Sequence, residues 1–135
     1  MAEPKTRPTD VPVADFIAAI ENPGRRADAE TVKALFAAVT GEAPVMWGKS
    51  IVGYGSYRAA SGDWPIIGFS PRKAQLVLYL MDQLADRSGR VARLGKVTTR
   101  GGCLYLTKLA NVDMAELRDL ATASVAWMRE THPAA

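Results

Sequence analysis

Apolar residues follow a helical period at both ends of the chain. Near the N-terminus, two stretches have the i, i+3, i+4, i+7 spacing that lines one face of a helix. These positions are Val13, Phe16, Ile17 and Ile20 in the first stretch, and Val32, Leu35, Phe36 and Val39 in the second. We predict that the first helix ends at residues 22–24, and that the second begins behind Asp28 as its N-cap and stops at Gly41.

The C-terminal stretch predicts a longer helix. Asp113, with Glu116 three residues further on, has the spacing of a capping box. One helical face then collects Leu117, Leu120, Ala121, Ser124, Val125 and Met128. We expect the tail to fray from Thr131 onward.

The middle of the chain has the pattern of strands. Gly53 and Gly55 occupy alternate positions among Tyr54 and Tyr57, which favours strands and disfavours a helix. We predict two or three short strands between residues 45 and 70, with a hairpin turn at 59–63. Residues 75–81 are apolar on both faces, which predicts a central strand, with a buried helix as the alternative. We expect a short helix or loop at 84–94, an exposed basic segment between Gly95 and residues 101–102, and a strand at 103–107.

These elements together predict a single α+β domain. The apolar faces of the helices must be buried away from water, and a sheet formed by the strand-rich middle can pack against them. The expected architecture is a two-layer sandwich, with the N-terminal and C-terminal helices packed on one face of an antiparallel sheet of about five strands. We expect one domain over residues 1–135, with an ordered core at about 11–129.

Composition and charge narrow the class of protein. Hydrophobic residues make up 48% and charged residues 23%, with no apolar run of the ~20 residues that a membrane span needs. Cys103 is the only cysteine and the first ten residues lack the apolar core of a secretory signal, so we expect a cytoplasmic protein. The net charge is only +3, but residues 72–108 hold eight basic residues against Asp82 and Asp86. This local basic field favours an anionic partner.

Catalytic chemistry finds little support in the sequence. The single histidine, His132, lies in the expected tail, whereas acid–base catalysis needs a positioned side chain. Cys103 is the one candidate nucleophile, but we expect it to pack as a small buried strand residue. We therefore expect no catalytic residues and no His/Cys metal site.

Carboxylates on the first two predicted helices offer an alternative metal site. Oxygen ligands can hold a hard cation or ferrous iron. The candidate ligands are Asp15, Glu21, Asp28 and Glu30. A solvated helix face explains the same residues, because charged side chains normally occupy the outward stripe.

Aromatic and basic residues predict a ligand pocket in the strand-rich middle. Arg72 and Lys73 at a turn can hold a carboxylate or phosphate, and aromatic side chains can form the apolar walls. The predicted ligand-binding residues are Trp47, Tyr54, Tyr57, Arg72, Lys73 and Lys96. The alternative is that the Trp and Tyr residues belong to the core.

Several short motifs resemble the YdhG-like family, a bacterial domain of unknown function. They are Met-Trp-Gly at 46–48, the Gly/Tyr stretch at 51–57, Gly-Phe-Ser-Pro-Arg-Lys at 68–73, Leu-Gly-Lys at 94–96 and Gly-Cys-Leu-Tyr at 102–105. The resemblance spans about residues 16–125 in the family's order. It implies a small frataxin-like α+β fold, and some members of the family are labelled intracellular iron chaperones.

Three functional hypotheses follow. The first is a non-enzymatic binding domain, without a cofactor, whose aromatic and basic surface receives a small anionic ligand or an acidic protein partner. The alternative is a frataxin-like chaperone that binds iron through the four carboxylates. A second alternative is a nucleic-acid-binding protein that uses residues 87–100, and the chain is expected to be a monomer or a homodimer.

Overall fold

The computed structural model describes residues 8–59, 62–80, 87–100 and 103–132. Helices lie near both ends of the chain, and most of the strands lie between them. The helices are α1 (Val13–Ala18), α2 (Pro23–Thr40), α3 (Arg87–Ala92), the short 3-10 helix η1 (Leu109–Asn111) and α4 (Met114–Thr131). The strands are β1 (Val45–Trp47), β2 (Ile51–Tyr54), β3 (Tyr57–Ala59), β4 (Gly62–Trp64), β5 (Ile67–Pro71), β6 (Leu76–Leu80), β7 (Thr98–Arg100) and β8 (Cys103–Leu106). The predicted α+β class is confirmed. No helix in the described ranges has both the length and the apolar character to cross a membrane.

The strands in the described ranges form one large sheet and one separate hairpin. The large sheet has six strands in the order β1-β2-β5-β6-β8-β7, and every neighbouring pair is antiparallel. The antiparallel pairing of β3 with β4 confirms the predicted hairpin, while the middle of the predicted turn, residues 60–61, lies outside the described ranges. The sheet has more strands than expected because β7, predicted only as an exposed basic segment, pairs with β8 at the edge.

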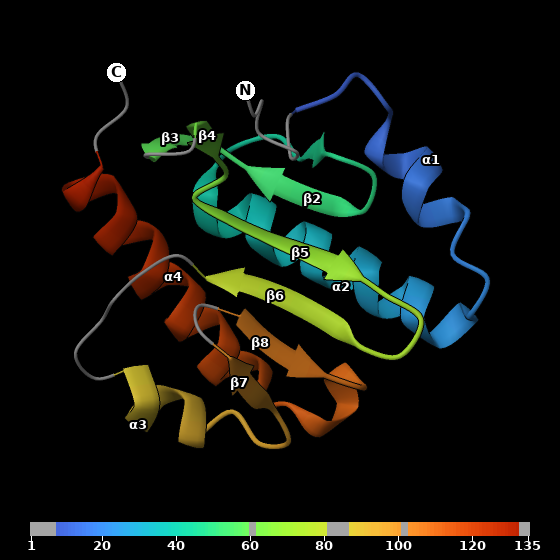
Figure 1. Ribbon diagram of the computed structural model, residues 1–135. Helices are drawn as coiled ribbons and strands as arrows, with labels where there is room; N and C mark the ends of the chain where they lie inside the picture. Colours follow the sequence, from blue (N-terminus) through green and yellow to red (C-terminus); the bar gives the residue numbers. More distant parts are fainter. Residues whose placement is uncertain (1–7, 60–61, 81–86, 101–102, 133–135) are drawn as a thin grey trace.

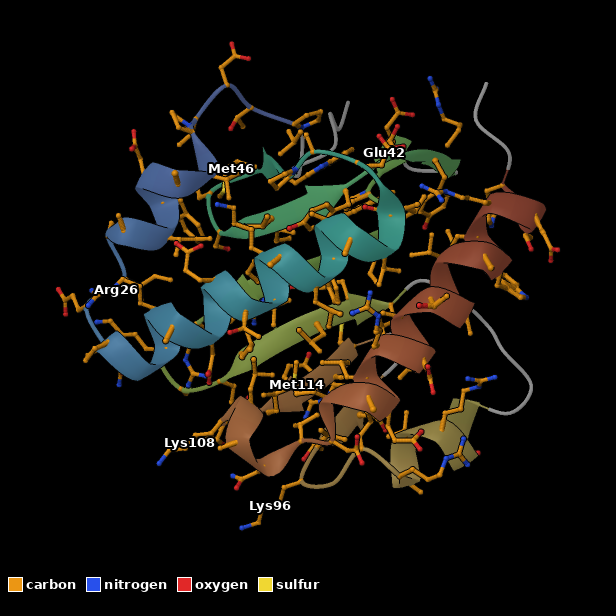
Figure 2. All side chains as sticks on the ribbon, turned by 180° about the vertical axis from the view of Figure 1, so that it is seen from behind. Arg26, Glu42, Met46, Lys96, Lys108 and Met114 are labelled. Carbon is orange, nitrogen blue, oxygen red and sulfur yellow. The ribbon has the colours of Figure 1, made fainter. Side chains whose placement is uncertain are left out.

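The longer helices cover one face of the large sheet. Helix α2 packs on β2 and β5, and α4 packs on β5 and on α2. Figure 1 shows the sheet in front of these two helices, and Figure 2, seen from behind, shows the helices in front of the sheet. The predicted placement on one face is therefore confirmed for α2 and for the C-terminal helix α4, whereas α1 packs against α2.

The start of α2 differs from the prediction. The helix begins at Pro23, and the Asn22 side chain caps it by accepting the N–H of Arg25 at 3.0 Å. Proline favours the first helical position because its fixed φ suits a helix and its missing N–H needs no partner there. Residues 22–24 therefore open α2, and the prediction of Asp28 as N-cap was wrong. The predicted stop is confirmed, since Gly41 has a left-handed φ of 70° and donates its N–H to the carbonyl of Ala37.

The predicted C-terminal helix and central strands are confirmed. Asp113 caps α4 by accepting the N–H of Glu116 at 3.1 Å, and all six predicted residues of the apolar face are buried. The Glu116 side chain accepts a hydrogen bond from Arg93, which directly follows α3, instead of closing the capping box. Residues 76–80 form a strand rather than a buried helix, with β5 and β8 on either side.

Phe36 of α2 joins the helix layer to the sheet. Its ring makes edge-to-face contacts with Tyr54 of β2 at 6.0 Å and with Phe69 of β5 at 6.1 Å between ring centroids. All three side chains are fully buried. The Tyr54 hydroxyl donates to the carbonyl of Lys33 at 2.8 Å, which adds a directed bond between the sheet and α2.

Gly53 allows Trp47 to pack flat on the other face of the sheet. A Cβ at Gly53 would lie 2.4 Å from Cδ1 of Trp47 and 2.7 Å from Cβ of Pro65. Trp47 faces Ile51 across the β1–β2 pair and is 3% exposed. Close packing therefore requires the glycine at position 53 of this strand.

We expect Gly53→Ala to lower the free energy of unfolding by about 1–3 kcal/mol, because the added methyl group must displace the Trp47 ring. Chemical denaturation measures the change. The matched control is Gly89→Ala in α3, where the nearest atom to a new Cβ is Nη1 of Arg93 at 4.0 Å. Alanine is the better helix former, so the control keeps or raises stability. Equal stability of Gly53→Ala and the parent protein would contradict this account of the packing.

Candidate functional site

A cleft with basic walls lies where the first turns of α2 cross one end of the sheet. Its walls come from α2, from the turn between β5 and β6, and from the segment that follows β8. The cavity has a volume of about 460 Å³, and we call it the basic cleft. Arg25, Lys73 and Lys108 line it together with one carboxylate, Asp28.

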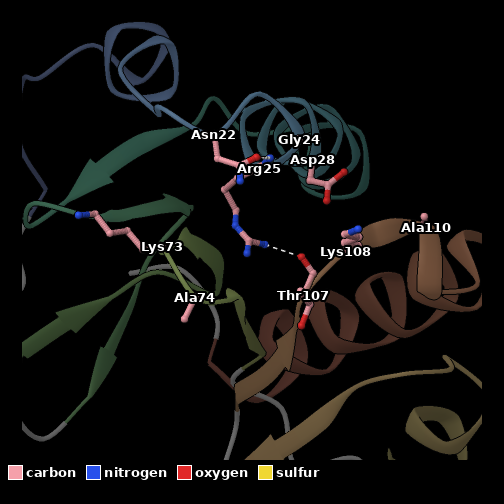
Figure 3. A pocket seen from close by; sticks show the side chains of 9 residues that line it. All are labelled: Asn22, Gly24, Arg25, Asp28, Lys73, Ala74, Thr107, Lys108 and Ala110. Atoms are coloured by element: carbon pink, nitrogen blue, oxygen red, sulfur yellow. Dashed lines mark hydrogen bonds between the residues drawn. The ribbon is translucent and has the colours of Figure 1, made fainter.

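Arg25 forms the floor of the basic cleft. The side chain is 9% exposed, and its Nη1 donates to the carbonyl oxygen of Thr107 at 2.7 Å. Figure 3 shows the guanidinium reaching from α2 towards Thr107 at the end of β8. The buried Nε has no hydrogen-bond partner among the described residues. Arg25 therefore brings a positive charge to the lining of the cleft, and one of its buried donors has no partner among the described residues.

Asp28 does not neutralise this cation by a direct ion pair among the described contacts. Its Oδ2 accepts the backbone N–H of Leu109 at 3.1 Å, one helical turn along α2 from Arg25. The two bonds, from Arg25 and to Asp28, tie the first turns of α2 to the segment after β8. They connect two walls of the cleft to each other.

Two further cavities adjoin the basic cleft. One, of about 510 Å³, lies beside the α1–α2 connection, shares Asn22, Arg25 and Lys73 with the cleft, and adds Arg72. The other, of about 630 Å³, shares Thr107 and Lys108 and adds Lys96 and Tyr105 of β8; we call it the β8 pocket. Figure 2 shows Lys96 and Lys108 at the same end of the molecule.

The structure brings the three predicted basic site residues to this end of the sheet. Arg72 and Lys73 are exposed in the turn after β5, which the Arg72 N–H closes by donating to the Gln75 carbonyl at 2.9 Å. The Lys73 ammonium points away from the Arg25 guanidinium (Figure 3). Lys96 is exposed at the rim of the β8 pocket.

The three predicted aromatic residues lie elsewhere. Trp47 and Tyr54 are buried, on opposite faces of the sheet, as the core alternative would have them. Tyr57 sits on the β3–β4 hairpin, where its ring lies 4.8 Å from the ring of His132 between centroids. The expected aromatic walls are therefore not part of the basic cleft, and His132 packs on a neighbouring ring at the end of α4.

Arg72 is engaged on the open face of the sheet. Its Nη2 donates to the hydroxyl of Tyr79 at 2.7 Å. Burial raises the pKa of Tyr79, and the positive charge of Arg72 partly offsets this rise. Cys103 is half-buried on the strand next to Tyr79, so the expected burial of its side chain is incomplete.

The carboxylates of the iron alternative do not gather in the described part of the chain. Glu30 pairs with Lys33 at 3.7 Å, and Asp28 is bonded to Leu109. Asp15 lies in α1, and Glu21 lines the cavity beside the α1–α2 connection. Within the described ranges, no three His, Cys, Asp or Glu side chains lie close enough together to hold a metal ion.

The basic segment 87–100 is divided between different surroundings. The Nε of Arg93 pairs with Glu116 of α4 at 3.2 Å. Arg100 lies 6.0 Å from the centroid of the Tyr105 ring, and Lys96 borders the β8 pocket. Arg93, Lys96 and Arg100 therefore lie in three different surroundings.

Sequence reasoning missed Arg25, which is central to the basic cleft. The missed signal is the Asn22-Pro23 pair, which has the N-cap and first-position preferences of a helix start. With that start, Arg25 falls in the first turn of α2. Its contact with Thr107, however, links residues 82 positions apart, which no local pattern predicts.

Comparisons with known proteins add no relative to this description. No family model, no curated protein and no solved structure matches the chain. A buried guanidinium with an unused donor, among further cations, can bind the oxygen atoms of an anion.

We expect stability to fall at alkaline pH because of Tyr54. Burial raises the pKa of Tyr54 above its ordinary value of 10.0, so the folded protein holds this proton more tightly than the unfolded chain. The contribution to stability is full below pH 10.0 and is lost as the pH rises above that value. Tyr54→Phe should cost about 1 kcal/mol at neutral pH, because Lys33 loses a donor, and should flatten the alkaline decline. Urea denaturation over a pH series measures both effects, and an unchanged decline in the variant contradicts the assignment.

Proposed function

We propose that this protein binds a small anionic ligand through its basic cleft and performs no chemistry on it. The observation that carries the proposal is the Arg25 guanidinium, 9% exposed, with an Nε that has no partner among the described residues. A buried polar group without a partner costs free energy, so a ligand oxygen that accepts this N–H is stabilised.

The charges around the cleft support an anion rather than a cation as the ligand. Arg25 is bonded to a neutral carbonyl, so the bond with Thr107 leaves its positive charge in place. Lys108 adds a second cation to the lining, against the single carboxylate of Asp28, and Lys73 lines the cleft with its ammonium pointing away from Arg25. A partly enclosed site of one dominant sign attracts counter-ions more strongly than an open surface does.

The fold supports a finer assignment that we also propose. The motifs that resemble the YdhG-like family occur in the family's order, and helices from both ends of the chain lie on one face of an antiparallel sheet. A frataxin-like arrangement is the expected form of such a domain. Iron binding is not proposed, because the described carboxylates do not gather into a ligand set.

Isothermal titration calorimetry with inorganic phosphate and with acetate tests anion binding. We expect saturable binding of at least one of the two ions in the millimolar range or tighter. Arg25→Lys keeps the charge but removes the Nε donor, and should weaken binding about tenfold, as expected for the loss of a charge-assisted hydrogen bond. Lys108→Ala should weaken anion binding less than Arg25→Lys does. A higher salt concentration should weaken anion binding by the parent protein, because salt screens the charges.

The matched control is Arg58→Ala. Arg58 is a cation on β3 whose side chain is 80% exposed and pairs with Asp63 at the surface, outside the lining of the cleft. Its removal lowers the net charge by the same amount as Lys108→Ala. Equal losses of affinity in these two variants would indicate non-specific charge attraction and overturn the proposal, as would the absence of binding by the parent protein.

A further inference from the structure

We propose that the sheet face opposite α2 binds a single-stranded nucleic acid by stacking its bases on Tyr79 and Tyr105. Helices α2 and α4 pack on the other face, and Figure 1 shows β5, β6 and β8 with no described helix in front of them. We call this surface the open face. Arg25 reaches the basic cleft from the helix side, so binding to the open face does not require the anion of the proposed function.

The strand register places both tyrosines on the open face. Phe69 of β5 packs on α2, and its partners in the neighbouring strands, Leu78 of β6 and Leu104 of β8, share that side of the sheet. Successive residues of a strand point to opposite faces. Tyr79 and Tyr105 therefore point to the open face, each next in sequence to a residue of the helix side.

The two rings lie close together on this face. Tyr79 is paired with Cys103, and two residues further along β8 Tyr105 follows as its diagonal neighbour. Such a placement separates two residues by about 7–8 Å, within the reach of aromatic side chains. Burial raises the pKa of Tyr79, and the positive charge of Arg72 lowers it. Cys103 and Tyr105 raise this pKa further, as expected for groups gathered on one face. Both tyrosines are partly exposed.

Each tyrosine has an arginine beside it. Nη2 of Arg72 donates to the Tyr79 hydroxyl at 2.7 Å. The Arg100 guanidinium lies 6.0 Å from the centroid of the Tyr105 ring. Both arginines are exposed, and a guanidinium has several N–H donors that suit phosphate oxygens. A ring for the base and a cation for the phosphate next to it are the two groups that single-strand binding needs.

Charge and space on the open face also favour a nucleic-acid strand. The six strands of the large sheet, as the structure describes them, contain no Asp or Glu. Tyr105 and its cross-strand partner Thr98 line the β8 pocket of about 630 Å³, to which Lys96 adds a positive charge. The pocket therefore has room for a base next to the Tyr105 ring.

An acidic peptide is the competing partner, because it also carries negative charge. A peptide that binds a sheet commonly adds a strand to the edge. Tyr79 and Tyr105, however, lie on β6 and β8, which both have neighbours on either side. Carboxylates would pair with the arginines and leave the two rings without a planar partner, whereas bases stack on aromatic side chains of a sheet.

Fluorescence anisotropy with a labelled oligothymidylate and a labelled oligouridylate tests the inference on the intact chain. We expect saturable binding of at least one of the two strands. Tyr105→Leu should weaken it about tenfold, the loss of one stacked base, whereas Tyr105→Phe should keep the affinity. The matched control is Tyr57→Leu, which should leave the affinity unchanged because Tyr57 lies on the β3–β4 hairpin against His132.

Salt dependence tests the phosphate contacts. Arg100→Ala should make the slope of log affinity against log salt concentration about 0.7 shallower, the value for one phosphate of a single strand. Arg58→Ala removes an exposed cation of the hairpin and should keep the slope. Arg25→Lys should weaken phosphate binding without changing oligonucleotide affinity, so the two proposals can fail separately.

Cys103 reports the place of binding in the parent protein. It is the only cysteine of the chain, half-buried on the open face next to Tyr79. A saturating oligonucleotide should slow its reaction with N-ethylmaleimide severalfold, whereas inorganic phosphate should leave the rate unchanged.

Three results would overturn the inference: no oligonucleotide binding, an affinity that neither Tyr79→Leu nor Tyr105→Leu lowers, or an unchanged reaction rate of Cys103. An oligoglutamate peptide that binds as tightly, and that loses affinity with Arg100→Ala but not with Tyr105→Leu, would identify an acidic partner instead. Tighter binding of oligouridylate supports the inference with RNA as the strand, and tighter binding of oligothymidylate supports it with DNA.

Discussion

The position of α2 on the sheet is the constraint on which the rest of the molecule depends. Phe36 enters between Tyr54 and Phe69, and burial of three aromatic side chains is worth more than any hydrogen bond at this interface. The contact sets the distance of the helix from the sheet, and the bond from Tyr54 to the Lys33 carbonyl sets its position along the helix axis. With that part of α2 fixed, its first turns must project over the end of β8.

This position of the first turns explains why Arg25 is buried, although arginine side chains are rarely buried in proteins. A buried cation is costly unless it is paired, and Arg25 finds a carbonyl dipole instead of a carboxylate. The nearest acid in the cleft lining, Asp28, accepts a backbone N–H of η1. The arrangement is stable enough to form but leaves positive charge uncompensated, which is the condition for attracting an anion. Arg25 and Asp28 therefore both connect α2 to the segment after β8 and line the basic cleft.

The sequence predicted the layers of the fold better than its connections. Periodicity identified the buried face of α4 from Leu117 to Met128, because one buried face imposes a repeat that the sequence must show. An unbroken apolar run identified β6, which has buried residues on both faces. The start of α2 was wrong because Asn22 and Pro23 suit both the end of one helix and the start of the next. Basic residues such as Lys73 and Lys96 were expected at a site because charged side chains in turns are exposed. The sequence could not distinguish aromatic residues of the core from those that line a pocket. Tyr54 lies in the core and Tyr105 lines a pocket, although both are tyrosines on short strands.

The bond between Arg25 and Thr107 also governs when the cleft comes into existence. It joins segments 82 residues apart, so the floor of the cleft is absent until the chain has closed nearly its longest loop. Contacts of such sequence separation form late in folding. If the cleft binds an anion as proposed, that anion would find no site in partly folded chains and would lengthen the lifetime of the native state rather than change the rate of folding. For this protein, occupancy of the cleft would report on the completion of folding.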